Sequence, residues 1–109
     1  MTIITITKSP KGEYKEVSCK GHAGFARAGQ DIVCSAVSVL VINTINSIER
    51  LTNCQMTVIS EEENGMIICR FPQKPDEGGR LLLDSMILGL QSIVEEYGKK
   101  YLKLKFKEV

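Results

Sequence analysis

The apolar pattern of residues 31–51 constrains the fold of this chain more than any other feature. Its large apolar side chains recur at steps of three and four residues, as on one face of a helix, while Asn43 and Asn46 fall off this stripe. The stripe consists of Val33, Val37, Leu40, Val41, Ile45, Ile48 and Leu51. Its β-branched content would also suit a strand, but strands average only about 5 to 6 residues. The pattern therefore predicts a long, mostly buried helix with Asp31 as its N-cap.

A second helix is predicted at residues 80–97. Its apolar stripe consists of Leu83, Met86, Ile87, Leu90, Val94 and Tyr97. Gly98 follows directly and predicts the C-cap, because glycine adopts the left-handed conformation in which helices often end. The chain therefore contains two amphipathic helices, far apart in the sequence.

Five short runs rich in β-branched and apolar residues predict strands, at residues 2–7, 14–20, 54–60, 66–72 and 101–106. Ser9-Pro10-Lys11-Gly12 has turn chemistry and joins the first two runs as a hairpin. Asn64-Gly65 favours positive φ and marks the turn between the third and fourth. Alternate strand residues are expected to face the core, among them Val17, Cys19, Ile67, Cys69, Phe71, Leu102, Leu104 and Phe106. The order ββαββαβ predicts an α+β fold, with a mostly antiparallel five-stranded sheet and two helices on one face.

Length and composition predict a single soluble domain at residues 1–109, since 43% of the residues are hydrophobic and 25% are charged. The net charge of +1 favours neither a nucleic-acid nor a membrane partner. The N-terminus lacks the basic flank and apolar core of a signal peptide, and no apolar run reaches the ~18 residues of a membrane span. We therefore expect a cytoplasmic protein, in which Cys19, Cys34, Cys54 and Cys69 stay reduced.

Residues 21–38 hold the strongest candidates for chemistry. They contain the only histidine, His22, and Cys34 twelve residues later, with a loop of small residues between them. If Asp31 caps the helix, Cys34 is its third residue, where the helix dipole favours the thiolate. The backbone N–H groups of Cys34 and Ser35 would then serve an oxyanion, and His22 would act as general base and then general acid. The loop, with Ala23, Gly24, Phe25 and Gly29, would close over a substrate.

Each of these residues also has a simpler interpretation. Cys34 would be a small core residue and His22 a surface residue at a strand end, and the spacing alone favours this pair of roles. Asp31 either orients His22 or caps the helix, and capping is the preferred role. Ser38 either lines the site, one turn after Cys34, or bonds back to a helix carbonyl group. Neither alternative for Ser38 is favoured.

The chain offers no convincing metal site. Cys19 and His22 have a spacing that sometimes holds zinc, but a second pair of ligands is missing from the sequence. The acidic run Glu61-Glu62-Glu63 is interpreted as the solvated tip of a hairpin rather than as catalytic carboxylates. We therefore expect neither a metal nor another cofactor.

The segments Gly21-His22-Ala23 and Gly29-Gln30-Asp31-Ile32-Val33-Cys34-Ser35-Ala36-Val37-Ser38 resemble the signature of the ribosomal-processing cysteine protease family, Prp. The resemblance extends to the order of elements along nearly the whole chain. It implies His22 and Cys34 as the catalytic pair, while Gly21, Asp31 and Ser38 match other characteristic positions. Ser35 departs from the alanine expected in many relatives, and one small residue for another leaves the chemistry intact.

The resemblance also implies a substrate and a partner. Family members are small bacterial cysteine endopeptidases that remove an N-terminal extension from large-subunit ribosomal protein twenty-seven. The cleaved segment ends in aromatic residues, so an apolar groove is expected, and relatives form homodimers. Two alternatives are a non-catalytic ribosome-assembly module with a buried Cys34, and a thiol enzyme that acts on another ester or amide.

Overall fold

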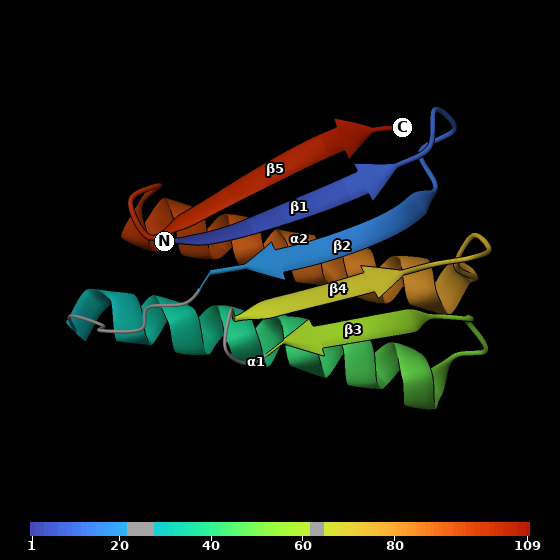
Figure 1. Ribbon diagram of the computed structural model, residues 1–109, viewed down its shortest axis with the longest axis horizontal. Coiled ribbons are helices and arrows are strands. Elements are labelled where there is room, and N and C mark those ends of the chain that lie inside the picture. Colours follow the sequence, from blue (N-terminus) through green and yellow to red (C-terminus); the bar gives the residue numbers. More distant parts are fainter. Residues whose placement is uncertain (22–27, 62–64) are drawn as a thin grey trace.

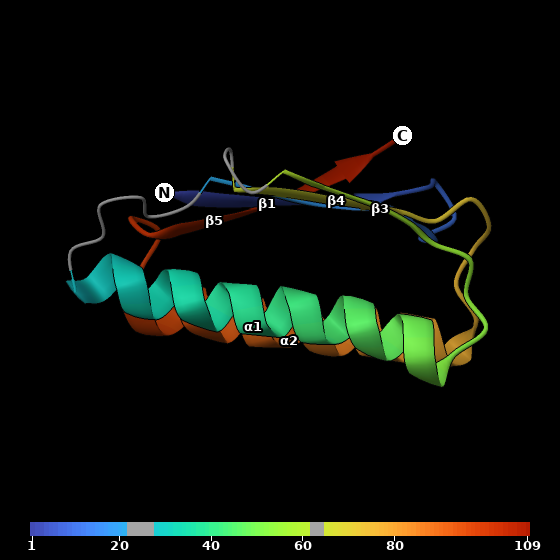
Figure 2. The same ribbon diagram turned by 60° about the horizontal axis from the view of Figure 1, so that its bottom comes forward.

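The computed structural model describes residues 1–21, 28–61 and 65–109, with the backbone alone at 28–31. A five-stranded sheet forms one layer, and two helices cover one of its faces as the second layer (Figures 1 and 2). The elements in chain order are β1 (Thr2–Lys8), β2 (Tyr14–Lys20), α1 (Ala28–Leu51), β3 (Thr57–Glu61), β4 (Met66–Arg70), α2 (Glu77–Tyr97) and β5 (Leu102–Glu108). The predicted order ββαββαβ and the α+β fold class are confirmed.

The strands lie in the order β3-β4-β2-β1-β5. Neighbouring strands pair antiparallel except β1 and β5, which pair in parallel with Thr2 opposite Leu102. Helix α1 connects β2 to β3, and helix α2 connects β4 to β5. The two strands of each pair run in the same direction, so each helix is the long crossover connection that such strands need. Strands β3 and β5 are consequently the two edges of the sheet (Figure 1).

The core lies between the sheet and the helices, as the two apolar stripes predict. Its side chains with the least exposed surface are Ile4, Ile6, Val33, Val37, Val41, Ile48, Cys69, Leu83, Met86, Leu90 and Leu102. Three residues predicted to face the core are exposed instead: Leu51 by 75%, Phe106 by 55% and Tyr97 by 40%. Leu51 and Tyr97 are the last residues of their helices, and Phe106 lies near the end of an edge strand. Their spacing fits the apolar faces, but side chains at or near the end of an element have fewer neighbours to cover them.

Helix α1 begins four residues earlier than predicted and helix α2 three residues earlier. Helix α1 starts at Ala28, so Asp31 is its fourth residue and the predicted N-cap is wrong. The positive end of a helix dipole favours an aspartate in the first turn as well as at the cap, so residue type does not separate the two positions. Helix α2 starts at Glu77, and its N-cap Asp76 accepts a hydrogen bond from the Gly79 N–H at 2.8 Å. Gly98, with φ of 89°, is the C-cap, as predicted.

The expectation that no apolar run is long enough for a membrane span is wrong: one stretch of α1, Ile32–Leu51, has a mean hydropathy of 1.6 and is long and apolar enough by length and composition alone. The core helix of a soluble protein meets the same criterion. Val33, Val37, Val41 and Ile48 of this stretch are buried against the sheet, at most 1% exposed. This packing accounts for part of the apolar character of the stretch, since Ile32, Val39, Ile42 and Leu51 are 45% to 75% exposed.

Candidate active site

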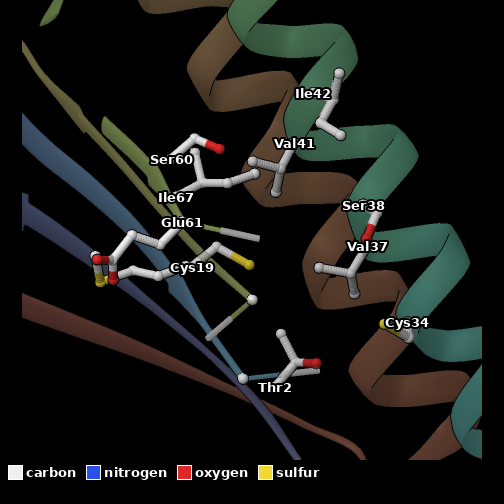
Figure 3. Close-up of a pocket in the computed structure, with 13 residues that line it drawn as sticks. Thr2, Cys19, Cys34, Val37, Ser38, Val41, Ile42, Ser60, Glu61 and Ile67 are labelled. Carbon is white, nitrogen blue, oxygen red and sulfur yellow. The ribbon is translucent and has the colours of Figure 1, made fainter. Parts of the chain in front are cut away.

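Cys34 borders a cavity of about 260 Å³ that lies between α1 and the neighbouring ends of the strands (Figure 3). The floor and walls are mostly apolar, with Val37 and Val41 from α1 and Ile67 from β4. Ser38 adds a hydroxyl group to the helix side of the cavity. A half-buried thiol therefore opens onto a space that accommodates part of a ligand.

Gly21 lines the same cavity and fixes where the chain leaves β2. Its φ is +88°, and a Cβ atom built on it would lie 2.5 Å from the carbonyl oxygen of Met1. Only glycine tolerates both the left-handed backbone and this close approach. The residue directly before His22 is thereby held at the cavity that contains Cys34. His22, Ala23, Gly24 and Phe25 themselves lie outside the described residues.

The helix position of Cys34 differs from the expected one. Because α1 begins at Ala28, Cys34 is its seventh residue rather than its third. In a regular helix the N–H groups of Cys34 and Ser35 bond to carbonyl groups four residues earlier, and only the first four N–H groups are free. The expected oxyanion site on these two N–H groups does not fit this helix. The dipole also acts mainly within the first turn, and Cys34 lies beyond that turn.

A second thiol shares the cavity. The sulfur of Cys19 points from β2 toward α1 in Figure 3, and the residue is 8% exposed. Burial, with a smaller electrostatic effect of Cys34, raises the pKa of Cys19 to about 11. Cys19 therefore stays protonated at neutral pH and is a poor nucleophile, although it lies near the reactive position.

The remaining two cysteines, Cys54 and Cys69, lie away from the cavity. Burial raises the pKa of Cys69 to about 12, and its side chain is in the core as predicted. Cys54 is half-buried before β3, and its thiol donates a hydrogen bond to Asp76 Oδ1 at 3.2 Å. Of the four cysteines, Cys34 thus combines partial exposure with a place on the cavity and no described hydrogen-bond partner.

Ser38 lines the cavity one turn after Cys34 (Figure 3). Thr44, Thr52 and Ser92 each donate a hydrogen bond to the carbonyl group four residues earlier, whereas no such bond of Ser38 is found in the described part of the chain. Its hydroxyl group is therefore available to a bound ligand. The backbone of Gly29 and Asp31 lies in the first turn of α1, and a role of Asp31 in orienting His22 stays a prediction.

Nothing in the local sequence indicates that two further residues, Thr2 and Ser60, line the cavity. Thr2 begins β1 and Ser60 lies near the end of β3, and both reach the cavity only through the register of the sheet. Within residues 1–21, 28–61 and 65–109, no three histidine, cysteine, aspartate or glutamate side chains are grouped as metal ligands would be.

Known proteins of one family are similar to this chain over most of its length. The family model described as "Cysteine protease Prp" matches residues 1–103. The ribosomal processing cysteine protease Prp of Staphylococcus aureus is 29% identical over 107 residues, which cover 98% of this chain and 100% of the relative. That of Bacillus subtilis is 31% identical over 97 residues, or 85% of this chain and 87% of the relative.

Two solved structures of the S. aureus protease resemble the present fold closely. One, in complex with a substrate peptide, superimposes with a TM-score of 0.91 at 28% identity and covers 98% of this chain and 100% of that one. The other carries a covalently linked product peptide, with a TM-score of 0.88 at 29% identity over the same shares of the two chains.

Proposed function

The chain belongs to the family of the cysteine protease Prp, and on this premise we propose that Cys34 is its nucleophile and His22 its general base. The enzyme class follows from the family, so the non-catalytic alternative is set aside. The assignment of the two residues rests on one observation above all: the Cys34 thiol opens onto the cavity that Gly21, the neighbour of His22, also lines.

The reaction follows from thiol chemistry. His22 takes the thiol proton, and the Cys34 sulfur attacks the scissile carbonyl carbon. The C–N bond breaks as His22 returns the proton to the leaving amine, which leaves a thioester on Cys34. Water, deprotonated by His22, then attacks this thioester and releases the carboxylate product and the thiol. Oxyanion donors other than the N–H groups of Cys34 and Ser35 are required, because those two lie too far inside α1.

We propose that the substrate is the N-terminal extension of large-subunit ribosomal protein twenty-seven. The names of the two relatives, ribosomal processing proteases, support this choice, as does the peptide complex of the S. aureus protein. The mostly apolar cavity suits an apolar side chain of such a peptide, which would contact Val37, Val41 and Ile67. Ser38, which lines the same cavity, would donate a hydrogen bond to the bound chain.

The proposal includes a cellular setting. We place the enzyme in the cytoplasm as a homodimer that works without a metal or cofactor and without a nucleic-acid or membrane partner. Reduced thiols suit that compartment, because Cys34 acts only as a free thiol.

The test is incubation with the ribosomal protein of the same organism, followed by mass measurement of the products. Wild-type enzyme is expected to release the N-terminal segment, and Cys34→Ala and His22→Ala are expected to leave the protein intact. Cys54→Ala is the matched control, because Cys54 hydrogen-bonds to Asp76, the N-cap of α2, and the start of α2 lies at the opposite end of the molecule from the start of α1 (Figure 1). Equal cleavage by wild type and Cys34→Ala would refute the assignment.

A further inference from the structure

Strand β3 is an open edge of the sheet that leads to the cavity. It pairs on one side only, with β4, and all five of its residues are exposed. Within the described part of the chain, the backbone of Thr57, Val58, Ile59 and Ser60 forms no hydrogen bond outside this pairing. The outer N–H and C=O groups of these four residues are therefore open to pairing with another extended chain.

The two edge strands, β3 and β5, differ in whether their side chains oppose pairing with a further strand. Strand β5 alternates Lys103, Lys105 and Lys107 with its other residues, and charged side chains on an edge oppose pairing with a further strand. Strand β3 has the sequence Thr-Val-Ile-Ser-Glu, without lysine or proline, and its only charge is at the last residue. Val58 and Ile59 are 43% and 40% exposed. Residues with high strand propensity thus lie on the unprotected edge.

The end of β3 coincides with the proposed reaction centre. Ser60 and Glu61 line the cavity with Cys34 (Figure 3). Val58 and Ser60 lie opposite Cys69 and Ile67, so these two side chains share the face of the sheet that the helices cover. A peptide that lies along β3 and continues beyond its end would therefore pass the Cys34 thiol.

We propose that an extended segment of the substrate binds along β3 as a sixth strand and so presents its scissile carbonyl group to Cys34. This inference rests on the proposed function and adds how the substrate is held. Hydrogen bonds from the β3 backbone would bind the main chain of the substrate whatever its sequence. Alternate substrate side chains would face the helix side, where the apolar cavity lies, and those between would face away from it.

Hydrogen exchange on the Cys34→Ala variant tests the proposal without need of turnover. The probe is a synthetic peptide that spans the junction removed from the ribosomal protein. Saturating peptide is expected to slow exchange of the outward amides of β3, while the amides of β5 exchange at an unchanged rate. Slowing of both edges or of neither, despite binding, would overturn the proposal. The β3 amides could instead exchange slowly before peptide is added and faster once the protein is diluted. That result would show that β3 pairs with a second copy of this chain, and the proposal would be wrong.

Methylation of the peptide backbone gives an independent readout. Single N-methyl groups are placed in turn along the segment expected to lie on β3, and affinity for Cys34→Ala is measured. Every second methyl group is expected to weaken binding about 2- to 10-fold, the effect of one lost hydrogen bond. The methyl groups between are expected to have little effect. Binding losses without this alternation would refute strand addition, whereas an unmodified peptide that wild type does not cleave would refute the proposed function.

Discussion

The four cysteines differ in what surrounds each thiol, and this difference predicts the order in which they react. The pKa values of about 11 for Cys19 and about 12 for Cys69 mean that under about one molecule in a thousand carries either thiolate at neutral pH. Cys34 is half-buried on the cavity. We expect iodoacetamide to alkylate Cys34 at least about tenfold faster than Cys19 or Cys69, as followed by peptide mass spectrometry.

The pH dependence of that labelling has a definite sign. Raising the pH by one unit increases the thiolate of Cys19 and Cys69 about tenfold, because both pKa values lie far above neutral. Their alkylation should therefore accelerate in proportion, up to about pH 11 for Cys19. If no cysteine is labelled until urea unfolds the protein, and all four are then labelled together, Cys34 is not reactive in the folded protein.

Gly21 offers a test of how the chain is directed toward His22. Gly21→Ala places a methyl group against the Met1 carbonyl oxygen at φ +88° and should cost about 1 to 3 kcal/mol of stability, with a loss of cleavage rate. Gly12→Ala is the matched control, because Gly12 has φ +80° but nothing within 4 Å of the added Cβ. Thermal unfolding and kcat/KM are measured for both. Equal effects of the two substitutions on cleavage would show that the contact with Met1 is irrelevant.

At the level of single residues, part of the site is predictable from the sequence. Local chemistry points to Cys34 and Ser38 and the family resemblance to Gly21, and all three line one cavity. Thr2 and Cys19 are not predictable as cavity residues, because strand register brings them there. The alternation of its strand marks Cys19 only as a core residue, and burial does keep its thiol protonated.

The start of α2 carries a prediction about pH. The pKa of Asp76 is lowered, first by the backbone N–H of Gly79 and then by the Cys54 thiol. A folded pKa below the unfolded 3.8 means that the charged cap stabilises the fold above pH 3.8, and this contribution disappears as pH falls through the folded pKa. Asp76→Asn should therefore lower Tm at pH 7, and the difference from wild type should shrink below pH 3.8. A difference in Tm that stays constant from pH 7 to pH 2 would contradict the role of the charge.

Element types are predictable from this sequence and element ends are not. The helical period identifies both helices, but Gly78 and Gly79 have low helix propensity and hide the first turn of α2, which Asp76 caps. In α1 the first turn is rich in small residues, and Asp31 gives the same local signal inside the turn as at the cap. The resulting shift of four residues moves Cys34 from the third to the seventh helical position, about one turn, and removes the expected oxyanion donors.

The packing of the helix layer on the sheet sets the stability of the whole molecule. Leu90 is fully buried and Leu88, on the same helix, is 67% exposed. Leu90→Ala is expected to lower the free energy of unfolding by about 2 to 5 kcal/mol, because it leaves a cavity in the core. Leu88→Ala should change it by no more than about 0.5 kcal/mol. Urea unfolding measures both, and a loss at Leu88→Ala as large as at Leu90→Ala would mean that Leu88 is covered in solution.

The overall fold is predictable because element order and apolar faces agree with one another. Alternating strands and two amphipathic helices leave few arrangements that bury every apolar face. The parallel pairing of β1 with β5 carries no such local signal, since it depends on which way α2 returns the chain across the sheet. Because α2 carries the chain to the far side of β1, β3 remains an edge strand, and its end lies at the cavity with Cys34. This contact joins residues more than twenty positions apart, so no local pattern predicts it.

The most direct test of Cys34 as the nucleophile is covalent trapping, because Cys19 lies in the same cavity and competes for any reagent that enters it. A chloromethyl ketone is prepared from the peptide segment that precedes the cleavage site, so that attack forms a C–S bond and releases chloride. Peptide mass spectrometry of the treated enzyme then locates the label. A nucleophilic Cys34 predicts one label per chain, on that residue, with matching loss of cleavage. Label on Cys19, or full inhibition with Cys34 unmodified, would contradict it.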